Sequence, residues 1–152
     1  MLGLPIKNVI EPRKLVVAAP WTSVAQAARL MKEGNVGAVL VVEEERLVGI
    51  FTERDAVCRV MAHGLDPAST ALSEVMTREP KTVAPDETFG YALLLMFENG
   101  FRHVPVVDNG RPVGVVSARH ALDPDIEEFA AEAERRKHIR RRAARKKGPD
   151  PS

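Results

Sequence analysis

The sequence predicts an α+β protein that contains two copies of one strand–helix–strand–strand–helix unit, followed by a basic C-terminal helix. Three observations carry this prediction. Residues 16–57 align with residues 81–122 without a gap. The stretch GIFTERD, Gly49–Asp55, returns as GVVSARH, Gly114–His120. A strongly basic segment, RRKHIRRRAARKK, follows the second copy. An internal repeat of this length decides the architecture before any single motif is considered.

Each copy begins with a short extended segment and a helix. KLVVAAP and PKTVAP are the extended pieces, and each is stopped by proline. Apolar residues in SVAQAARLMKEGN recur at helical spacing, with Ser23 as N-cap and Gly34–Asn35 as the stop. ETFGYALLLMFENG repeats this pattern and stops at Asn99–Gly100. The sequence therefore predicts one amphipathic helix at the same place in each copy.

Two strands and a second helix complete each copy. GAVLVVE and HVPVVD are rich in β-branched residues and predict buried strands. EEER and DNGR predict turns, and Asn109–Gly110 is a strong hairpin signal. LVGIFT and PVGVVS predict the returning strands, and ERDAVCRVMAHG predicts a helix that ends at Gly64.

These elements divide the chain into four parts. Repeat 1 is expected over residues 7–64, a linker over 65–79, repeat 2 over 80–123 and a helical tail over 124–152. At the start of the tail, an apolar face is predicted to pack against the body; it consists of Ile126, Phe129, Ala130 and Ala133.

The repeated motif, Gly-aliphatic-x-Thr/Ser-x-x-Asp, has two interpretations. A hydroxyl at a helix N-terminus can meet a phosphate, and an Asp one turn later can accept hydrogen bonds from two ribose hydroxyls. In the structural interpretation, Thr52 caps the helix and Asp55 is a favourable acid in its first turn. The motif by itself leaves both open.

Taken together, the motifs resemble those of a pair of CBS (cystathionine-beta-synthase) domains. The resemblance covers residues 7 to about 123 and rests on VGIFTERD, VMTREPKTVAPDET and GFRHVPVVDNGRPVGVVSARH. It implies two repeats packed about a pseudo-twofold axis, with two clefts between them. It also implies an adenosine-containing ligand, commonly AMP, ADP or ATP and sometimes S-adenosylmethionine or NAD, and no required cofactor.

The resemblance assigns residues to the first cleft from both repeats. Thr52 and Asp55 are expected to face the basic pair Arg102–His103, and Arg119 is expected to point toward the phosphates. Pro80, Lys81 and Thr82 are expected to line the base. Guanidinium groups suit phosphate oxygens, and His103 can donate to a phosphate.

The second cleft departs from the family pattern. Ser117 is kept, but His120 stands where the motif has Asp, and the basic pair becomes Gly37–Ala38. Arg54 is the remaining residue expected to supply positive charge there. The resemblance therefore implies one complete cleft and one degenerate cleft.

No other chemical site is expected. The four histidines show no metal-ligand spacing, and Cys58 is interpreted as a small buried hydrophobe. The sequence contains no Ser-His-Asp order, phosphate-binding loop or paired-carboxylate site, so an enzyme is not expected. The single cysteine, the lack of a secretory signal and the lack of a long apolar run favour a cytoplasmic protein with no membrane contact.

Charge is divided unevenly along the chain. Residues 135–152 contain nine Lys/Arg against one Asp, whereas the body is acidic. The leading hypothesis is a stand-alone regulatory module that binds an adenine nucleotide and signals to an unknown partner protein. The alternative is a nucleic-acid-associated dimer that acts through the basic tail by neutralising phosphates.

Relatives with this repeat pair through their helices, so a homodimer is expected. The apolar faces of SVAQAARLMKEG and TFGYALLLMFENG exceed what one small pair of repeats needs to cover. Phe89, Leu93 and Phe97 are the residues expected at the interface.

Overall fold

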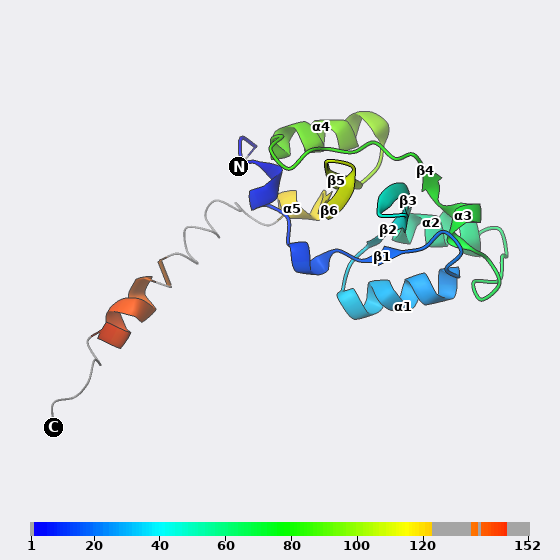
Figure 1. The fold of residues 1–152 in the computed structure, drawn as a ribbon, viewed down its shortest axis with the longest axis horizontal. Coiled ribbons are helices and arrows are strands. Elements are labelled where there is room, and N and C mark those ends of the chain that lie inside the picture. The colour runs from blue at the N-terminus through cyan, green and yellow to red at the C-terminus, as the bar shows by residue number, and fades with distance from the viewer. Residues whose placement is uncertain (1, 123–134, 137, 146–152) are drawn as a thin grey trace, which may run out of the picture.

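The computed structural model describes residues 2–122, 135, 136 and 138–145, and two similar halves make up its body (Figure 1). Figure 1 shows α1 and α4 on opposite sides of the body, with the strands between them. The first half contains β1 (Val17–Ala18), α1 (Val24–Gly34), β2 (Ala38–Glu43), β3 (Arg46–Thr52), α2 (Glu53–Asp55) and the π-helical turn η3 (Ala56–Met61). The second contains α4 (Phe89–Asn99), β5 (His103–Asp108), β6 (Arg111–Ser117) and α5 (Arg119–Leu122).

The local signals place these elements as the sequence predicted. Ser23 caps α1 by accepting a hydrogen bond from Gln26 N at 3.1 Å. The left-handed residues Asn35 and Gly100 end α1 and α4. Asn109 and Gly110 both have positive φ in the β5–β6 turn, as the hairpin signal requires. These predictions are confirmed.

The two sheets are related but unequal. Strands β1, β2, β3 and β4 (Thr77–Arg78) form one sheet in that order, with β1 parallel to β2 and the other pairs antiparallel. Strands β5 and β6 form the other sheet, where an isolated parallel bridge from Val83 to Val106 takes the place of β1. The ladder shifts register between Val41 and Val42 and again at the equivalent step between Val106 and Val107. The repeat thus extends to the irregularities of the backbone.

The short segment before each half packs in the core of the other half. The 3-10 turn η1 (Ile6–Asn8) belongs to the second half's core, and Ile6 N donates to Glu87 O at 2.8 Å. Helix α3 (Leu72–Val75) belongs to the first half's core, and Leu72 N donates to Thr22 O at 2.9 Å. Between η1 and β1 the chain forms a second 3-10 turn, η2 (Pro12–Lys14).

The segment expected to link the halves is therefore structured, because it contains α3 and β4. The sequence gives no helical signal here, because a helix of four residues is too short to show a helical repeat of apolar residues. The expected domain boundaries themselves stay a prediction.

A third apolar cluster lies between the halves and joins their sheets. Ala38, Leu40 and Ile50 form its buried centre, and Val115 of β6 packs against them. This contact sets β3 beside β6 and thereby fixes how the end of β3 in one half meets the start of β5 in the other.

Helix α4 corrects one expectation about the interface. Phe89 is completely buried in the second half's core, together with Ala92 and Met96 at helical spacing, so the prediction that Phe89 faces a partner is wrong. Leu93 is partly buried against the same core, whereas Phe97 is 87% exposed. The helix is apolar on all sides, so its sequence does not reveal which face turns inward.

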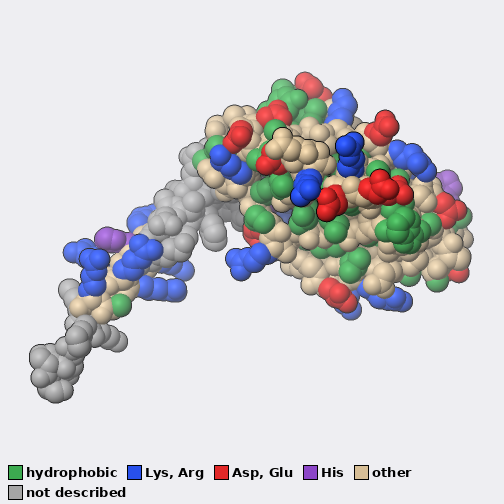
Figure 2. Space-filling model, viewed as in Figure 1, with side chains coloured by type: hydrophobic (Ala, Val, Ile, Leu, Met, Phe, Trp, Pro, Cys, Tyr) green, Lys and Arg blue, Asp and Glu red, His purple; other side chains and the backbone are tan. Residues whose placement is uncertain are grey.

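The described part of the tail is helical and exposed. Residues 138–145 form a helix whose surface is dominated by Arg side chains, shown in blue in Figure 2. Ile126, Phe129, Ala130 and Ala133, which were expected to pack, lie outside the described residues. The nucleic-acid hypothesis stays a prediction.

Candidate functional site

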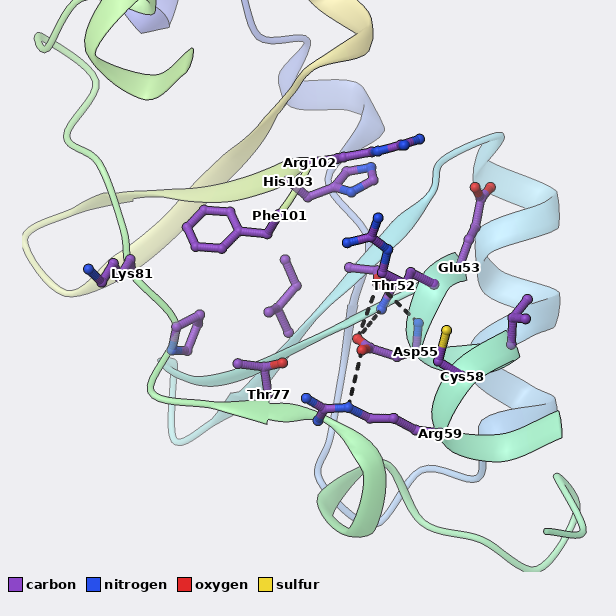
Figure 3. A pocket seen from close by; sticks show the side chains of 14 residues that line it. Thr52, Glu53, Asp55, Cys58, Arg59, Thr77, Lys81, Phe101, Arg102 and His103 are labelled. Atoms are coloured by element: carbon purple, nitrogen blue, oxygen red, sulfur yellow. Dashed lines mark hydrogen bonds and ion pairs between the residues drawn. The ribbon is translucent and has the colours of Figure 1, made fainter. Parts of the chain in front are cut away.

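A cavity of about 590 Å³ lies where the two halves meet, at the end of β3 and the start of β5 (Figure 3). The first half contributes the β3–α2–η3 junction, and the second contributes residues 101–103. The residues that line it are Ile50, Thr52, Glu53, Arg54, Asp55, Val57, Cys58, Arg59, Thr77, Pro80, Lys81, Phe101, Arg102 and His103. Of the eight residues expected in the complete cleft, Thr52, Asp55, Pro80, Lys81, Arg102 and His103 line this cavity.

Thr52 and Asp55 cap the helix at the floor of the cavity. Asp55 Oδ2 accepts from Thr52 N at 2.9 Å and from Thr52 Oγ1 at 3.1 Å, while Asp55 N donates to Thr52 Oγ1 at 3.3 Å. This capping box satisfies backbone groups that the helix start would otherwise leave unpaired. The structural interpretation of the motif therefore holds, and any ligand must bind to a carboxylate that is already ordered.

Arg59 holds the other oxygen of the same carboxylate. Its Nε lies 3.5 Å from Asp55 Oδ1, and its Nη1 donates to the carbonyls of Val75 and Met76 at 3.2 and 3.0 Å. Asp55 is only 9% exposed, so this cation compensates a largely buried charge. Figure 3 shows Arg102 and His103 on one side of Thr52 and Asp55, and Arg59 on the other.

Arg59 was missed in the sequence. A signal was available, because Asp55 and Arg59 stand four residues apart on one helical segment, where opposite charges interact. Phe101 and Ile50 were also missed, and they supply much of the apolar wall. No local pattern marks them, because Ile50 on β3 and Phe101 in the loop before β5 face this cavity only after the two halves pack.

Arg54, which was expected in the degenerate cleft, lines the main cavity. Its Nη1 donates to the carbonyl of Gly100 at 2.9 Å, so it bridges the two halves at the cavity. With Arg59, Lys81 and Arg102, it makes the lining more cationic than anionic, since Glu53 and Asp55 are the acids that line the cavity. The arrangement suits an anionic group at this edge.

Arg119 and Thr82 line other hollows. Arg119 lies with Lys32 and Asn35 in a hollow of about 380 Å³ beside α1, and Glu53 lines both this hollow and the main cavity. Thr82 lines a hollow of about 640 Å³ near the two hairpin turns. The structure therefore does not bring these two residues into the main cavity.

His103 is half-buried at the cavity wall, and burial lowers the pKa of its imidazole. The carboxylate of Glu53 opposes this effect, whereas Arg119, His120 and Arg102 lower the pKa further. Because the pKa falls below its usual value of about 6.5, His103 is neutral in the free protein at pH 7.

In the second repeat, His120 takes over the structural role that Asp55 has in the first. Ser117 N donates to His120 Nδ1 at 3.0 Å, which repeats the bond from Thr52 N to Asp55. The His120 ring meets Phe89 edge-on, with centroids 6.5 Å apart. Ala38 is buried, and Gly37 lies against His103. The capping geometry is thus kept, but the carboxylate is not.

Three further observations concern Cys58, metal sites and membrane spans. Cys58 is exposed at the cavity, so the expectation that it is buried is wrong. It lies on the π-helical turn η3, whose buried residue is Val60. Within the described residues, no three His, Cys, Asp or Glu side chains come together as a metal site requires. No helix in the described part of the chain has the length and apolar character needed to cross a membrane.

Comparison with known proteins agrees with this arrangement. The chain is 37% identical over 131 residues to an uncharacterised 17.7 kDa protein of Acidianus ambivalens, covering 82% of this chain and 78% of that protein. It resembles the crystal structure of an uncharacterised conserved protein from Pyrococcus horikoshii, with a TM-score of 0.73, 32% identity, and coverage of 81% of this chain and 92% of that one.

A third relative was solved with ligands. It is the CBS domain pair of protein MJ0100 in complex with 5-methylthioadenosine and S-adenosyl-L-methionine, with a TM-score of 0.69, 27% identity, and coverage of 78% of this chain and 96% of that one. The CBS domain family model matches residues 6–61 and again residues 72–124, so each match includes one of the exchanged segments. The chain belongs to the CBS domain family and carries two copies of that domain.

Proposed function

We propose that this chain is a regulatory module that binds one adenosine-containing ligand in the cavity between its repeats. The observation that carries the proposal is the meeting of three kinds of surface in one cavity. An apolar wall includes Ile50 and Phe101, an ordered carboxylate is provided by Asp55, and cations come from both repeats. Its volume of about 590 Å³ lies in the range of small-molecule sites.

Each part of the ligand has a matching surface. The base packs between Ile50, Pro80 and Phe101. Asp55 keeps acceptor capacity beyond the bonds from Thr52, since a carboxylate offers about four lone-pair sites, and this capacity serves the ribose hydroxyls. Arg54 and Arg102 face the anionic end. The adenosyl ligands of the MJ0100 domain pair support this class of ligand.

The proposal is of binding and signalling, not of turnover. Asp55 is already bonded to Thr52 and paired with Arg59, which suits a fixed anchor better than a general base. Arg54 and His103 line the cavity and also contact the opposite half. Replacing one bound ligand by another therefore alters the position of the two halves relative to each other. We infer that a partner protein reads this change.

Calorimetry with AMP, ATP and S-adenosylmethionine tests the proposal. We expect one site per chain for at least one of these compounds. Arg102→Ala should weaken AMP by roughly tenfold or more and adenosine much less, because a charged hydrogen bond contributes about 1.5–3 kcal/mol. Two equal sites per chain, or no heat with any of the three compounds, would contradict the proposal.

Proton uptake should accompany the binding of a phosphate-bearing ligand. His103 is neutral in the free protein, and an anion beside it favours the imidazolium, so binding raises the pKa of His103. Affinity for ATP should therefore rise as the pH falls from 8 to 6. Calorimetry in buffers of different ionisation enthalpy measures the proton, and His103→Asn is the control that subtracts the protonation of the phosphate itself.

The same lowered pKa affects the free protein in the opposite sense. The unfolded chain binds a proton on this histidine at about pH 6.5, above the folded-state pKa. The free energy of unfolding without ligand therefore decreases as the pH falls below that value.

If the affinity for ATP is equally pH-dependent in wild type and His103→Asn, His103 is not the group that takes up the proton.

We also propose that the chain associates with itself through the outer face of α4. This face exposes Tyr91, Leu94 and Phe97, at 45%, 52% and 87%. The equivalent residues on α1 are the exposed polar side chains Gln26, Arg29 and Lys32. The outer face is therefore apolar on α4 and polar on α1, which favours a protein partner at α4 and not at α1.

A further inference from the structure

Gly37 lies directly before β2 and against a side chain of the other repeat. A Cβ atom placed on Gly37 would lie 3.0 Å from His103 Nε2 and 3.3 Å from both His103 Cε1 and the carboxyl carbon of Glu53. Its backbone does not require glycine, because the glycines with positive φ are Gly64, Gly100 and Gly110. A side chain at position 37 would therefore require His103 to move.

The other repeat shows what this position otherwise carries. Gly37 O accepts from Glu53 N at 3.0 Å, and Arg102 O accepts from Ala118 N at 2.9 Å, which are equivalent bonds in the two halves. The backbone has the same role in both places, so the repeats differ here in the side chain. At this position the first repeat has Gly37, without a side chain, and the second has Arg102, whose guanidinium belongs to the cavity's basic pair.

We propose that Gly37 is a positioning residue whose missing side chain creates the space in which His103 lies. A side chain at position 37 and the imidazole of His103 compete for one volume between the repeats. The glycine at position 37 removes a basic side chain from one cleft, and the space that it leaves holds the basic pair's His103 in the other cleft. The consequence for ligand affinity rests on the proposed function, whereas the steric coupling does not.

The first test follows the imidazole of His103 in the full chain. Its NMR signals are assigned by their absence in His103→Asn, and its pKa is measured in wild type, Gly37→Ala and Gly37→Val. We expect Gly37→Val to move the ring toward solvent and to return its pKa toward about 6.5, and Gly37→Ala to give a smaller change in the same direction. An unchanged titration of His103 in Gly37→Val would overturn the proposal.

AMP affinity supplies the second readout. We expect Gly37→Val to weaken AMP on the order of tenfold, the effect of losing one charge-assisted hydrogen bond. Gly3→Ala is the control, because no atom lies within 4 Å of a Cβ placed there, and it should change neither the affinity nor the titration. If wild type does not bind AMP but the titration of His103 moves as expected, the choice of ligand is wrong and the role of Gly37 stands.

A double-mutant cycle gives a test that needs no ligand. Gly37→Val should lower the melting temperature in wild type and lower it much less in a His103→Ala background, because the competing ring is gone. Equal losses in both backgrounds would show that the two residues do not share a volume, and would overturn the proposal. If Gly37→Val does not fold, Gly37→Ala is carried through the same cycle and the same titration.

Discussion

Asp55→Ala is expected to lower both the stability of the free protein and its affinity for an adenosine-containing ligand. The substitution removes the acceptor for Thr52 N and Thr52 Oγ1 and the partner of Arg59. Thr52 remains the N-cap, so the free protein loses the reciprocal bonds of the capping box, which costs about 1 kcal/mol. Loss of the ribose anchor weakens binding by roughly 10- to 100-fold. Thermal unfolding and calorimetry on the same samples measure the two effects.

The second repeat provides the matched control for this variant. His120→Ala removes the equivalent cap, from Ser117 N to His120 Nδ1, on a residue that does not line the ligand cavity. It should lower the melting temperature and, at pH 8, where His103 is neutral in either variant, change the affinity far less than Asp55→Ala does. If both variants lose affinity to the same degree, binding responds to general stability, and Asp55 is not the anchor.

Leu94→Arg with Phe97→Lys is expected to convert the self-associated protein to a monomer. These substitutions place on α4 the residues that α1 carries at the equivalent positions, Arg29 and Lys32. Both wild-type side chains are exposed in the single chain, so the fold should tolerate the change. Burying apolar side chains drives association, and charges at the same place oppose it, so the dissociation constant should rise on the order of 100-fold or more.

Light scattering over a range of protein concentrations measures this effect. Arg29→Ala with Lys32→Ala, at the equivalent positions of α1, is the control and should leave the association unchanged. Wild type that stays monomeric at high concentration would remove the proposal. A double variant that associates as strongly as wild type would move the interface away from α4.

Local signals account for what the sequence predicted well. Ser23, Asn35 and the Asn109–Gly110 turn act through bonds and backbone angles within a few residues, so they could be read directly. The cap formed by Thr52 and Asp55 is equally local. For this reason the repeat, its helices and its hairpins were predicted nearly in full.

The wrong predictions concern the directions in which side chains point, which are decided by the packing of the two halves. Phe89 and Phe97 both lie on a helix without a polar side, and the core of the second half determines that Phe89 turns inward. Arg54 and Arg119 occupy equivalent positions, but the contact between the halves decides which hollow each one lines. The sequence around Ile6 does not predict its burial in the second half, because the residues that it packs against lie far along the chain.

The exchange of segments between the halves also bears on how the protein forms during synthesis. The core of the first half is complete once Met76 has been made. Ile6, Val9 and Ile10 must wait for strands that end near Val116. At the usual rates of translation, this delay is on the order of ten seconds. These three residues leave the ribosome before either repeat but are covered only when the second repeat is complete, and during that interval they form a short exposed segment on which a chaperone can act.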